Sequence, residues 1–405
     1  MMTRPIDFET AQQQFAHAFA WPLAATSVPT ADAAGRVLAA PLVAVLDQPS
    51  ADQSAMDGYA VRHAELASGT PLPVAQRCYA GDAPLPLAPR TAARIFTGSP
   101  IPPGADTVVM QEDAQERDGY VTFDADVRGG THIRRRGEEV QAGRVLIPAG
   151  VRLRPAHVGM IAAQGIGCVD VHPALRIGIL TTGDELVACG QPRLPQQIYN
   201  SNAPMLAALV AGAGAIVAAS THARDTADAI DRALRDLHAC CDLIVCVGGA
   251  SVGDRDLVRP ALTALGASFV LSGVRMKPGK PVALARLDGK PVVLLPGNPG
   301  AALTAFALLV TPLIRCLQGR DERVPLAPSL PIGADIEADD ARERFIRVRC
   351  GVASNGLPVL DTLRQQGAGT LCSLADAGGI ARLPAGRAIA RGDAVPYYDF
   401  AQWLA

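Results

Sequence analysis

The chain has 405 residues, of which 49% are hydrophobic, 19% charged and only 4% aromatic. This composition is typical of compact globular units and excludes a disordered chain, and the length suggests roughly two to four domains. The formal net charge is -2, so no global positive field attracts nucleic acid or anionic lipid, and neither is expected as a partner. We therefore expect any anion site to be local and the ligand to be small.

The cysteines and the first residues of the chain bear on its compartment. The nine cysteines show neither a C-x-x-C pair nor a Cys/His cluster at the spacing of a zinc site. The opening residues, MMTRPIDFETAQQQ, lack an apolar signal core, and the long apolar stretches are broken by Gly, Pro or charge before about 20 residues. We therefore expect a cytoplasmic protein with reduced thiols and no membrane span.

The first part of the chain predicts one helix followed by many short strands. The helix is expected at 8–19, and the strands that follow are punctuated by Pro and Gly. A second helix is expected within LRPAHVGMIAAQG, residues 153–165. We assign 26–137 to a β-rich domain, and 1–25 together with 138–174 to a helical and extended linking domain.

Strands and helices alternate in the next part of the chain, residues 175–321. The apolar strands LRIGIL, AIVAAS, DLIVCV, PVALARL and PVVLLP are interleaved with expected helices at 202–212, 226–239, 256–265 and 300–317. Thr226 and Asp256 stand where helix N-caps are expected. The pattern predicts an α/β multidomain protein whose central domain is a doubly wound, mostly parallel three-layer sheet. Residues 322–405 return to short strands and predict a small C-terminal β domain.

Acidic residues follow three of these strands. In an open parallel sheet, ligands bind beyond the carboxyl ends of the strands, so the loops TTGDEL, THARDT, GGASVGDRD and GNPGA are the place to look. They carry Glu185 or Asp184, then Asp225, then Asp254 or Asp256. Glycine-rich loops can bind a phosphate through their backbone N–H groups, but the nearby carboxylates would repel it. A hard cation such as Mg²⁺, bound between the carboxylates and the phosphate, would allow both to occupy one site. For one acid alone, helix capping is the simpler interpretation.

Two lysines lie close together in VRMKPGKPVAL, residues 274–284. Lys277 and Lys280 place two ammonium groups on one Pro-Gly turn, which suits a tetrahedral oxyanion, although a solvated basic hairpin has the same sequence. The turn is not a Walker loop, because Pro281 stands where Ser or Thr is needed. Arg134–Arg136 form another local positive patch or a solvated turn. Ser251 has no paired His and Asp, so a hydrolase triad is unsupported.

Several motifs occur in a family order: SAMDGYAVR, FTGSPIPPGADTVVMQED, IRRRGEEV, TTGDEL, GGASVGDRD, MKPGKP and LPGNPGA. Together, over about residues 40–380, they closely resemble the molybdopterin molybdenumtransferase family, the molybdenum insertases related to the C-terminal domain of gephyrin. The resemblance implies an elongated four-domain homodimer with its active site between the sheet domain of one subunit and the β domain of the other. It implies insertion of molybdenum from molybdate into adenylylated molybdopterin, with Mg²⁺-dependent release of AMP.

The same resemblance implies roles for individual residues. The catalytic and metal-binding acids are Glu185, Asp225 and Asp256, and the molybdate turn carries Lys277, Lys280 and Pro281. The nucleotide and pterin pocket is formed by Ser251, Gly249, Pro296 and Pro299. Asp57 and Thr97 are offered by the β domain across the dimer, and Arg342 and Ser373 complete the anion site. An upstream molybdopterin adenylyltransferase and downstream molybdoenzyme maturation proteins are the implied partners.

The chain departs from the family pattern at three places, which bear on the molybdate pocket more than on the nucleotide pocket. Gly273 stands where some members have another lysine, Ala301 where the family has Ser, and Ala368–Gly369 where a Ser pair is expected.

Two other functions are compatible with the same sequence features. One is a Mg²⁺-dependent nucleotide pyrophosphate hydrolase that needs no molybdate, and the other is a pterin-binding carrier or scaffold without catalysis.

Overall fold

A computed structural model of the chain describes residues 5–19, 24–66, 70–124, 127–249, 256–338 and 341–404. The chain divides into two compact units. The larger unit comprises residues 1–39, 149–158 and 168–405, and the smaller unit comprises 40–148 and 159–167. The chain thus passes from the larger unit into the smaller one twice, at 40–148 and again at 159–167, and returns each time. The predicted four-domain division is finer than this and remains a prediction.

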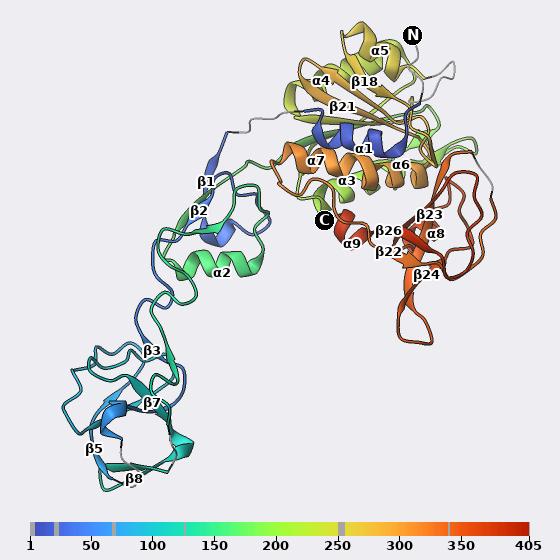
Figure 1. The fold of residues 1–405 in the computed structure, drawn as a ribbon. Helices are drawn as coiled ribbons and strands as arrows, with labels where there is room; N and C mark the ends of the chain where they lie inside the picture. The colour runs from blue at the N-terminus through green and yellow to red at the C-terminus, as the bar shows by residue number, and fades with distance from the viewer. Residues whose placement is uncertain are drawn as a thin grey trace. The chain divides into compact units, whose positions relative to one another are not determined.

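A six-stranded sheet with the order β16-β13-β17-β21-β20-β18 forms the centre of the larger unit (Figure 1). Its strands are β13 (Arg176–Thr182), β16 (Ile216–Ala223), β17 (Leu243–Val247), β18 (Ser268–Ser272), β20 (Ala283–Leu287) and β21 (Lys290–Leu295). The first four strands in the order are parallel to one another. Strand β20 runs antiparallel to both of its neighbours, β21 and β18. Only Asp288 and Gly289 join β20 to β21, too short a link for a parallel crossover. The mostly parallel sheet is confirmed, with an antiparallel edge.

Helices cover both faces of this sheet, which confirms the three-layer prediction. They are α1 (Phe8–His17), α3 (Asn202–Gly212), α4 (Ala227–Cys240), α5 (Val258–Ala264), α6 (Pro299–Ala305) and α7 (Thr311–Leu317). Figure 1 shows α4 and α5 on one face and α1, α3, α6 and α7 on the other. Two separate hydrophobic clusters fit this division: Leu234 packs with Ile244 on one face, and Phe306 packs with Val245 on the other.

The N-terminal boundaries of two helices test the predicted caps. The Thr226 hydroxyl accepts a hydrogen bond from the backbone N–H of Ala229 and caps α4, as predicted. Asp256 is not the cap of α5: that helix begins at Val258, and its N-cap is Leu257 with no side-chain hydrogen bond. The helix predicted from 256 therefore starts two residues later, and capping does not account for Asp256.

Residues Pro299–Leu317 form one continuous apolar run through α6, a π-helical turn η4 (Phe306–Val310) and α7. Among the described residues, this run alone has the length and composition of a membrane-spanning helix, and its apolar window is completely buried within the protein. The π turn directly precedes Thr311–Pro312, where the proline has no N–H to continue the ladder. The run is thus the core helix of the larger unit.

The end of the chain forms a second sheet in the larger unit, which confirms the small C-terminal β domain. Its order is β19-β23-β25-β26-β22, and β24 pairs with β23. The elements are β19 (Met276–Lys277), β22 (Ser329–Pro331), β23 (Glu343–Val352), β24 (Pro358–Thr362), α8 (Cys372–Ala375), β25 (Gly379–Leu383), β26 (Ala394–Asp399) and α9 (Phe400–Trp403). Ile332, Val348 and Leu360 are fully buried at its centre.

The smaller unit is built around a six-stranded sheet with the order β7-β4-β6-β5-β9-β8. The elements are β4 (Gly58–Val61), η2 (His63–Glu65), β5 (Leu72–Cys78), β6 (Ala92–Ile95), β7 (Thr107–Met110), η3 (Gln111–Asp113), β8 (Ala114–Arg117) and β9 (Tyr120–Phe123). The unit also contains two separate two-stranded ladders. They pair β2 (Leu42–Val43) with β11 (Val145–Ile147), and β3 (Gln53–Ser54) with β10 (Ile133–Arg134). The predicted β-rich character is confirmed.

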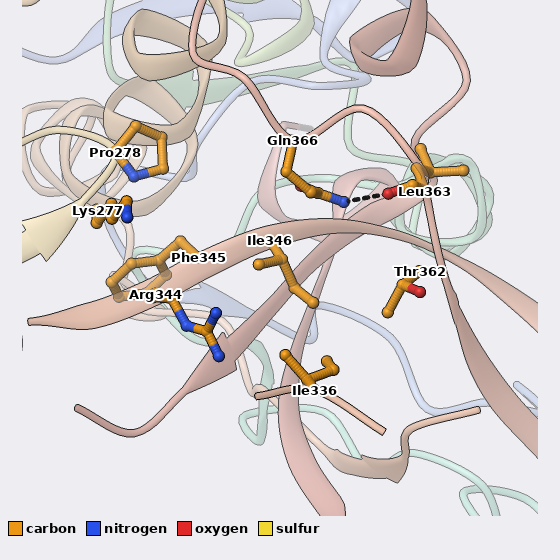
Figure 2. Close-up of a pocket in the computed structure, with 9 residues that line it drawn as sticks. All are labelled: Lys277, Pro278, Ile336, Arg344, Phe345, Ile346, Thr362, Leu363 and Gln366. Carbon is orange, nitrogen blue, oxygen red and sulfur yellow. Dashed lines mark hydrogen bonds between the residues drawn. The ribbon is translucent and has the colours of Figure 1, made fainter. Parts of the chain in front are cut away.

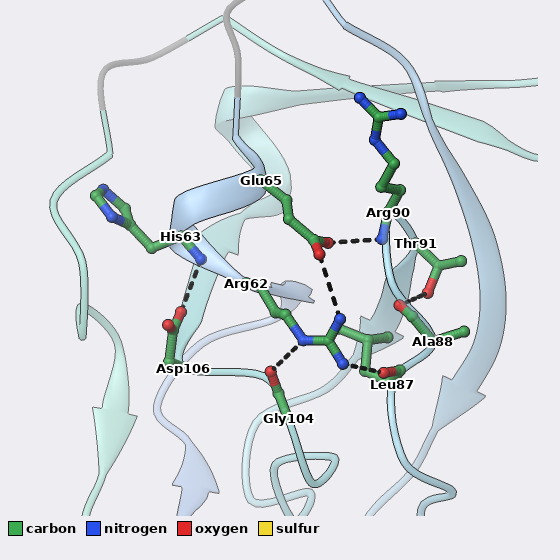
Figure 3. A network of polar contacts seen from close by, with 9 residues as sticks. All are labelled: Arg62, His63, Glu65, Leu87, Ala88, Arg90, Thr91, Gly104 and Asp106. Atoms are coloured by element: carbon green, nitrogen blue, oxygen red, sulfur yellow. Dashed lines mark hydrogen bonds and ion pairs between the residues drawn. The ribbon is translucent and has the colours of Figure 1, made fainter.

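Arg62 ties together three loops of the smaller unit (Figure 3). Its guanidinium donates to the carbonyls of Gly104 and Leu87 over 3.0 and 2.5 Å and pairs with Glu65 at 3.2 Å. Glu65 in turn accepts from the backbone N–H of Arg90. Because the guanidinium offers five donors in a fixed plane, one side chain satisfies carbonyls from separate segments.

The three arginines at 134–136 lie in an acid-paired turn of the smaller unit. Arg135 pairs with Asp52 at 2.7 Å, and Arg136 pairs with Asp47 at 2.6 Å. Arg134 contacts the carboxylates of Glu138 and Glu139. Each positive charge therefore has a neighbouring carboxylate, which favours the interpretation as a solvated turn over that as an anion site.

The remaining elements are short. In the larger unit, β1 (Thr26–Pro29) pairs with β12 (Cys168–Val171), η1 (Thr30–Asp32) follows β1, and β14 (Leu186–Val187) pairs with β15 (Ile198–Tyr199). The helix predicted within 153–165 is α2 (Pro155–Ala163), whose residues fall partly in each unit.

Candidate functional site

Four loops meet at one edge of the α/β sheet because β16, β13, β17 and β21 are neighbouring parallel strands. Their carboxyl ends lie at the same edge, where ligands of such sheets bind. The loops are those after Thr182, Ala223, Val247 and Leu295. We call this edge the strand-end rim. It carries the predicted acids Glu185, Asp225 and Asp256 and the predicted pocket residues Gly249, Pro296 and Pro299.

Asp184 and Asp225 face each other on the loops after β13 and β16. The backbone N–H of Asp184 donates to the Asp225 carboxylate over 3.3 Å, and the N–H of Asp225 donates to the Asp184 carboxylate over 3.4 Å. Arg224 lies 3.5 Å from the Asp184 carboxylate. Adjacent parallel strands in register produce this exchange, since Thr182 is opposite Ala223. The structure thus places two carboxylates side by side at the rim.

Glu185 is the neighbouring acid that the family resemblance, but not the loop pattern itself, favoured over Asp184. Its carboxylate folds back over Gly183: a Cβ on that glycine would lie 2.7 Å from the nearer oxygen. Gly183 has φ of +141° and so can accept this close approach. Glu185 is exposed, and its own role remains a prediction.

The third loop is described only at its two ends. Gly248 and Gly249 follow β17 with φ of +94° and +61°, and a Cβ on Gly248 would lie 2.7 Å from the Thr182 carbonyl oxygen. The predicted pocket residue Ser251 lies outside the described residues. Asp256 is described and half-buried, and its charge acts on the nearby guanidinium of Arg259. Glycine at 248 therefore allows the third loop to lie directly against the first.

The fourth loop joins the rim to the C-terminal domain. Asn202 donates to the Gly297 carbonyl over 2.6 Å and fixes the loop before α6. Pro296 is buried and Pro299 half-buried, whereas Gly297 and Asn298 are exposed. The N–H of Gly300, in the first turn of α6, donates to the carbonyl of Ala368 over 2.7 Å. Ala368, one of the positions where this chain departs from the family pattern, thus contacts the start of α6 directly.

The lysine turn also reaches the C-terminal domain. Lys277 belongs to β19, which pairs in parallel with β23 so that Lys277 is opposite Arg344. Gly279 in the turn has φ of +121°, and a Cβ there would lie 2.9 Å from the Met276 sulfur. Lys280 is exposed and Pro281 half-buried. The sequence contains only three lysines, and two of them, Lys277 and Lys280, lie on this one turn.

A cavity of about 250 Å³ opens beside this turn (Figure 2). Lys277, Pro278 and Arg344 line one part of it, and side chains of the C-terminal domain, among them Thr362 and Gln366, line the rest. Figure 2 shows the Gln366 amide turned toward the carbonyl of Leu363, to which it donates over 2.8 Å. Two cations from neighbouring strands of one sheet, on one cavity wall, favour an anionic ligand.

A buried arginine organises the loop that borders this cavity. Arg347 is 3% exposed. It donates to the carbonyls of Gln365 and Gly367 over 2.7 and 3.0 Å and to the Thr370 hydroxyl over 3.0 Å. Burial lowers the pKa of Arg347 below its usual value. Sequence reasoning missed this residue, because its acceptors lie 18 to 23 residues away in the chain and have no local pattern.

The two predicted residues of the C-terminal domain have different surroundings. Ser373 is buried, and its hydroxyl donates to the carbonyl of Gln365 over 2.6 Å, so it stabilises the same loop as Arg347. Arg342 is half-buried and directly precedes β23. Their predicted contact with an anion remains a prediction.

Asp57 and Thr97 meet in the smaller unit, as the sequence implied for a shared role. One carboxylate oxygen of Asp57 accepts from both the backbone N–H and the hydroxyl of Thr97, over 2.8 and 2.9 Å. The N–H bond first, and then the hydroxyl, lowers the pKa of Asp57 below its ordinary value. The exposed pair therefore presents a stable carboxylate on the surface of this unit.

Whether Mg²⁺ could bind at the strand-end rim depends on how many carboxylates are placed to hold it. Among the described residues, no group of three His, Cys, Asp or Glu side chains is placed to hold a metal ion. The set of Glu185, Asp225 and Asp256 thus remains a prediction. Mg²⁺, however, usually binds through one or two protein carboxylates and takes its other ligands from substrate phosphates and water. The Asp184–Asp225 pair supplies that number of carboxylates, so the residues present fit such an ion.

Three family models match the chain in succession. Residues 6–165 match the MoeA N-terminal region (domain I and II). Residues 178–316 match a probable molybdopterin binding domain, and residues 329–400 match the MoeA C-terminal region (domain IV). The matches together span both compact units and include the rim, the lysine turn and the C-terminal cavity.

Curated relatives and solved structures agree with these models. A molybdopterin molybdenumtransferase 2 from Mycobacterium tuberculosis is 38% identical over 79% of this chain and 82% of its own length. A molybdopterin molybdenumtransferase from Nostoc is 36% identical over 87% and 83%. The crystal structure of the molybdopterin biosynthesis moeA protein from Pyrococcus horikoshii OT3 superposes with a TM-score of 0.82 at 26% identity, covering 97% of this chain and 99% of that one.

Proposed function

Because this chain belongs to the molybdopterin molybdenumtransferase family, a family of transferases in molybdenum cofactor biosynthesis, we propose the details of its reaction. The substrates are molybdate and adenylylated molybdopterin, and the products are the molybdenum-loaded cofactor and AMP. The observation that carries the proposal is the strand register that places Lys277 opposite Arg344. Both residues line a cavity of about 250 Å³ in the same unit as the acidic rim. One wall thus suits an oxyanion, and the rim suits a cation with a pyrophosphate.

The rim residues bind the pyrophosphate end of the substrate in this proposal. Asp184 and Asp225 would hold Mg²⁺ together with phosphate oxygens, with Glu185 and Asp256 as further predicted ligands. When bound, such an ion supplies Lewis-acid polarisation of the phosphoryl group. At Gly297 a Cβ would have no neighbour nearer than 3.9 Å, so this exposed backbone leaves room for the substrate to approach the loop closely.

The lysine turn binds the second substrate. Lys277 and Lys280 attract molybdate, and Arg342 is the predicted third cation. Water attacks the adenylyl phosphorus, and the bridging phosphorus–oxygen bond breaks so that molybdopterin phosphate leaves with the bridging oxygen. AMP keeps the oxygen of the water, whose proton passes to solvent. If a molybdate oxygen attacks instead, water then hydrolyses the resulting adenylyl molybdate to AMP and molybdate. Holding both substrates on adjoining surfaces of one unit couples this cleavage to metal insertion by proximity.

We also propose that the enzyme acts as a homodimer in which a second copy of the chain presents Asp57 and Thr97 to the rim. The exposed Asp57–Thr97 pair supports this, because a fixed carboxylate on a separate surface suits a shared site. Mixing inactive Asp57→Asn chains with inactive Asp225→Asn chains tests it, since hybrid dimers then keep one intact site. Recovered activity supports the shared site, and no recovery in confirmed hybrids contradicts it.

Cytoplasmic placement is a further part of the proposal. All nine cysteines are free thiols, and Cys78, Cys241, Cys246 and Cys316 are buried. Thiols persist in reducing compartments.

Purified protein incubated with adenylylated molybdopterin, Mg²⁺ and molybdate distinguishes this function from its rivals. A transferase releases AMP and captures molybdenum together. A nucleotide pyrophosphate hydrolase also cleaves ADP or ATP and needs no molybdate, whereas a carrier binds the pterin without AMP release. Release of AMP that is independent of molybdenum capture overturns the proposal.

A further inference from the structure

One edge of the sheet in the smaller unit brings two aromatic rings close to a carboxylate. Strands β5 and β6 are parallel, and their last residues are opposite each other. The residues that follow, Tyr79 and Phe96, therefore leave the sheet side by side. Asp57 lies at the same edge, because it directly precedes Gly58, the first residue of β4, which is opposite Ile95, the last residue of β6.

These rings belong to a longer stack of planar groups. The Tyr79 and Phe96 rings have centroids 4.9 Å apart and planes only 8° apart. The Arg94 guanidinium lies over the Phe96 ring at 4.8 Å and over the Tyr59 ring at 5.0 Å. It donates to the carbonyl of Gly58 in β4, whereas Tyr79 follows β5, and these strands flank β6 on opposite sides. Arg94 and Tyr79 therefore contact Phe96 from opposite sides, and the stack runs from Tyr59 to Tyr79.

The inner members of this stack are held by hydrogen bonds. The Arg94 guanidinium also donates to the Gln111 side chain over 2.6 Å. The Tyr59 hydroxyl donates to the Glu116 carboxylate over 2.7 Å. Because the stack is already ordered, a ring that binds to its Tyr79 end immobilises few further groups, which favours affinity.

Tyr79 is the exposed end of the stack. Its relative exposure is 52%, whereas that of Tyr59, at the other end, is 5%. The backbone of Tyr79 lies in a turn: its N–H donates to the Asp82 carboxylate over 2.8 Å, and its carbonyl accepts from the Asp82 N–H over 3.0 Å. Stacking on Phe96 sets the plane of the ring. The unit therefore presents an aromatic face of fixed orientation to solvent.

The neighbouring carboxylate indicates which class of ligand suits this face. Phe96 directly precedes Thr97, and both hydrogen bonds from Thr97 go to one oxygen of Asp57, so neither uses the other oxygen. A carboxylate oxygen accepts hydrogen bonds from N–H groups, and an aromatic face stacks on any nucleobase-like ring. The combination suits a planar nitrogen heterocycle that carries N–H donors.

We propose that Tyr79 stacks on a heteroaromatic ring of the substrate. The inference rests on the proposed function, because adenylylated molybdopterin contains two such rings, adenine and the pterin. Tyr79 is then a specificity-determining residue that holds the ring and takes no part in bond cleavage. Its substitution should therefore raise KM for the substrate and leave kcat unchanged.

Calorimetric titration of the full-length protein with AMP and, separately, with the soluble pterin neopterin tests the stacking directly. Tyr79→Leu removes the aromatic face, and we expect it to weaken binding of one probe roughly tenfold, the scale of one base–aromatic stack. Tyr79→Phe keeps the face and should retain the affinity. A loss for AMP assigns adenine to Tyr79, and a loss for neopterin assigns the pterin.

Tyr120→Leu is the matched control for general loss of an exposed ring. Tyr120 is also 52% exposed, but it is opposite Pro73, near the start of β5 and away from Tyr79. Equal losses in the two leucine variants overturn the proposal. So does unchanged binding of both probes in Tyr79→Leu, or the absence of binding to the wild-type protein. A Tyr79→Leu protein that sediments as a monomer while the wild type is a dimer also overturns it, because Tyr79 is then a subunit contact.

Steady-state AMP release from adenylylated molybdopterin separates this inference from the proposed function. A roughly tenfold higher KM with unchanged kcat in Tyr79→Leu supports both. Normal AMP release with unchanged KM and unchanged probe binding in Tyr79→Leu overturns the stacking role alone. If the wild-type protein releases no AMP but binds a probe in a Tyr79-dependent way, the proposed reaction fails and the stacking site is supported.

Discussion

Asp184 and Asp225 exchange hydrogen bonds at the ends of two neighbouring parallel strands, each carboxylate accepting from the backbone N–H of the other. The exchange holds two negative charges side by side on loops that also leave glycine backbone accessible. Arg224, 3.5 Å from the Asp184 carboxylate, offsets part of this charge. The proposed cation, bound with the substrate phosphates, would offset the rest. The relationship makes Asp184 a candidate for the role that the family resemblance assigned to its neighbour Glu185.

Substitution distinguishes these two adjacent acids. We expect Asp184→Asn to lower the rate of AMP release roughly ten- to hundredfold, the usual loss when a partner of a metal-site carboxylate is removed. Glu185→Gln shows the smaller effect if Asp184 is the working acid. Steady-state AMP release at several Mg²⁺ concentrations measures both, with Asp236→Asn on the exposed face of α4 as the matched control. The reverse order of effects would restore Glu185 to the central role.

The lysine turn offers a direct spectroscopic test, because the sequence contains only three lysines. Reductive ¹³C-methylation labels each ammonium and keeps its charge. We expect molybdate to shift the resonances of Lys277 and Lys280 and to leave that of Lys290, whose ammonium donates to the carbonyls of His238 and Cys241. Lys277→Met and Lys280→Met assign the signals. A molybdate shift confined to Lys290, or the absence of any shift, argues against the turn as the oxyanion site.

Arg347 should stabilise the loop beside the cavity. Replacing it with Met leaves the acceptors at Gln365, Gly367 and Thr370 without their buried donor, and we expect a loss of roughly 2–4 kcal/mol in the free energy of unfolding. Arg349→Met is the matched control, because that side chain is 58% exposed and pairs with exposed Asp376. Urea denaturation measures both. Equal losses in the two variants would contradict the structural role of Arg347.

The pKa of Asp57 makes a pH-dependent prediction. Its pKa is lowered in the folded protein, so the contribution to stability is complete above the ordinary aspartate pKa of about 3.9 and is lost as pH falls through the lowered value. Thr97→Val removes the hydroxyl but keeps the N–H bond, which is the larger cause. The pKa should therefore rise only part of the way, as followed by carboxyl ¹³C NMR. A full return to the ordinary value would show that the hydroxyl dominates.

Close approach at the rim is tested by two glycines with similar backbone angles. Gly248 and Gly356 have φ of +94° and +80°, but only at Gly248 does a Cβ meet an atom, the Thr182 carbonyl oxygen. Gly356→Ala should cost roughly 1–2 kcal/mol for the left-handed backbone alone. Gly248→Ala should cost roughly 1–3 kcal/mol more, from steric conflict, and should impair AMP release. Thermal unfolding compares them, and equal losses would exclude a steric requirement.

The sequence predicted those features of the fold that depend on local pattern. Strands such as 243–247 and helices such as 202–212 have strong apolar periodicity, and the acid-bearing loops follow from the parallel order of the strands. The antiparallel edge was missed although Asp288–Gly289 is a hairpin turn signal, because both flanking strands are buried and apolar like their parallel neighbours.

Long-range pairings could not be predicted from the sequence. The parallel pairing of Met276–Lys277 with β23 involves two residues and has no local signal, yet it places the lysine turn beside the C-terminal cavity. The choice between Asp184 and Glu185 depends on backbone hydrogen bonds to a separate strand end. In both cases, the decisive contact joins segments more than 40 residues apart.

Simultaneous measurement of AMP release and protein-bound molybdenum in Asp225→Asn tests the central claim most directly. Wild-type protein and the Asp236→Asn control should release AMP and capture molybdenum together. Asp225→Asn should fold normally and bind adenylylated molybdopterin, yet lose both products in parallel. Wild-type levels of AMP and molybdenum in that variant would contradict the claim that the paired carboxylates at the rim drive the transfer.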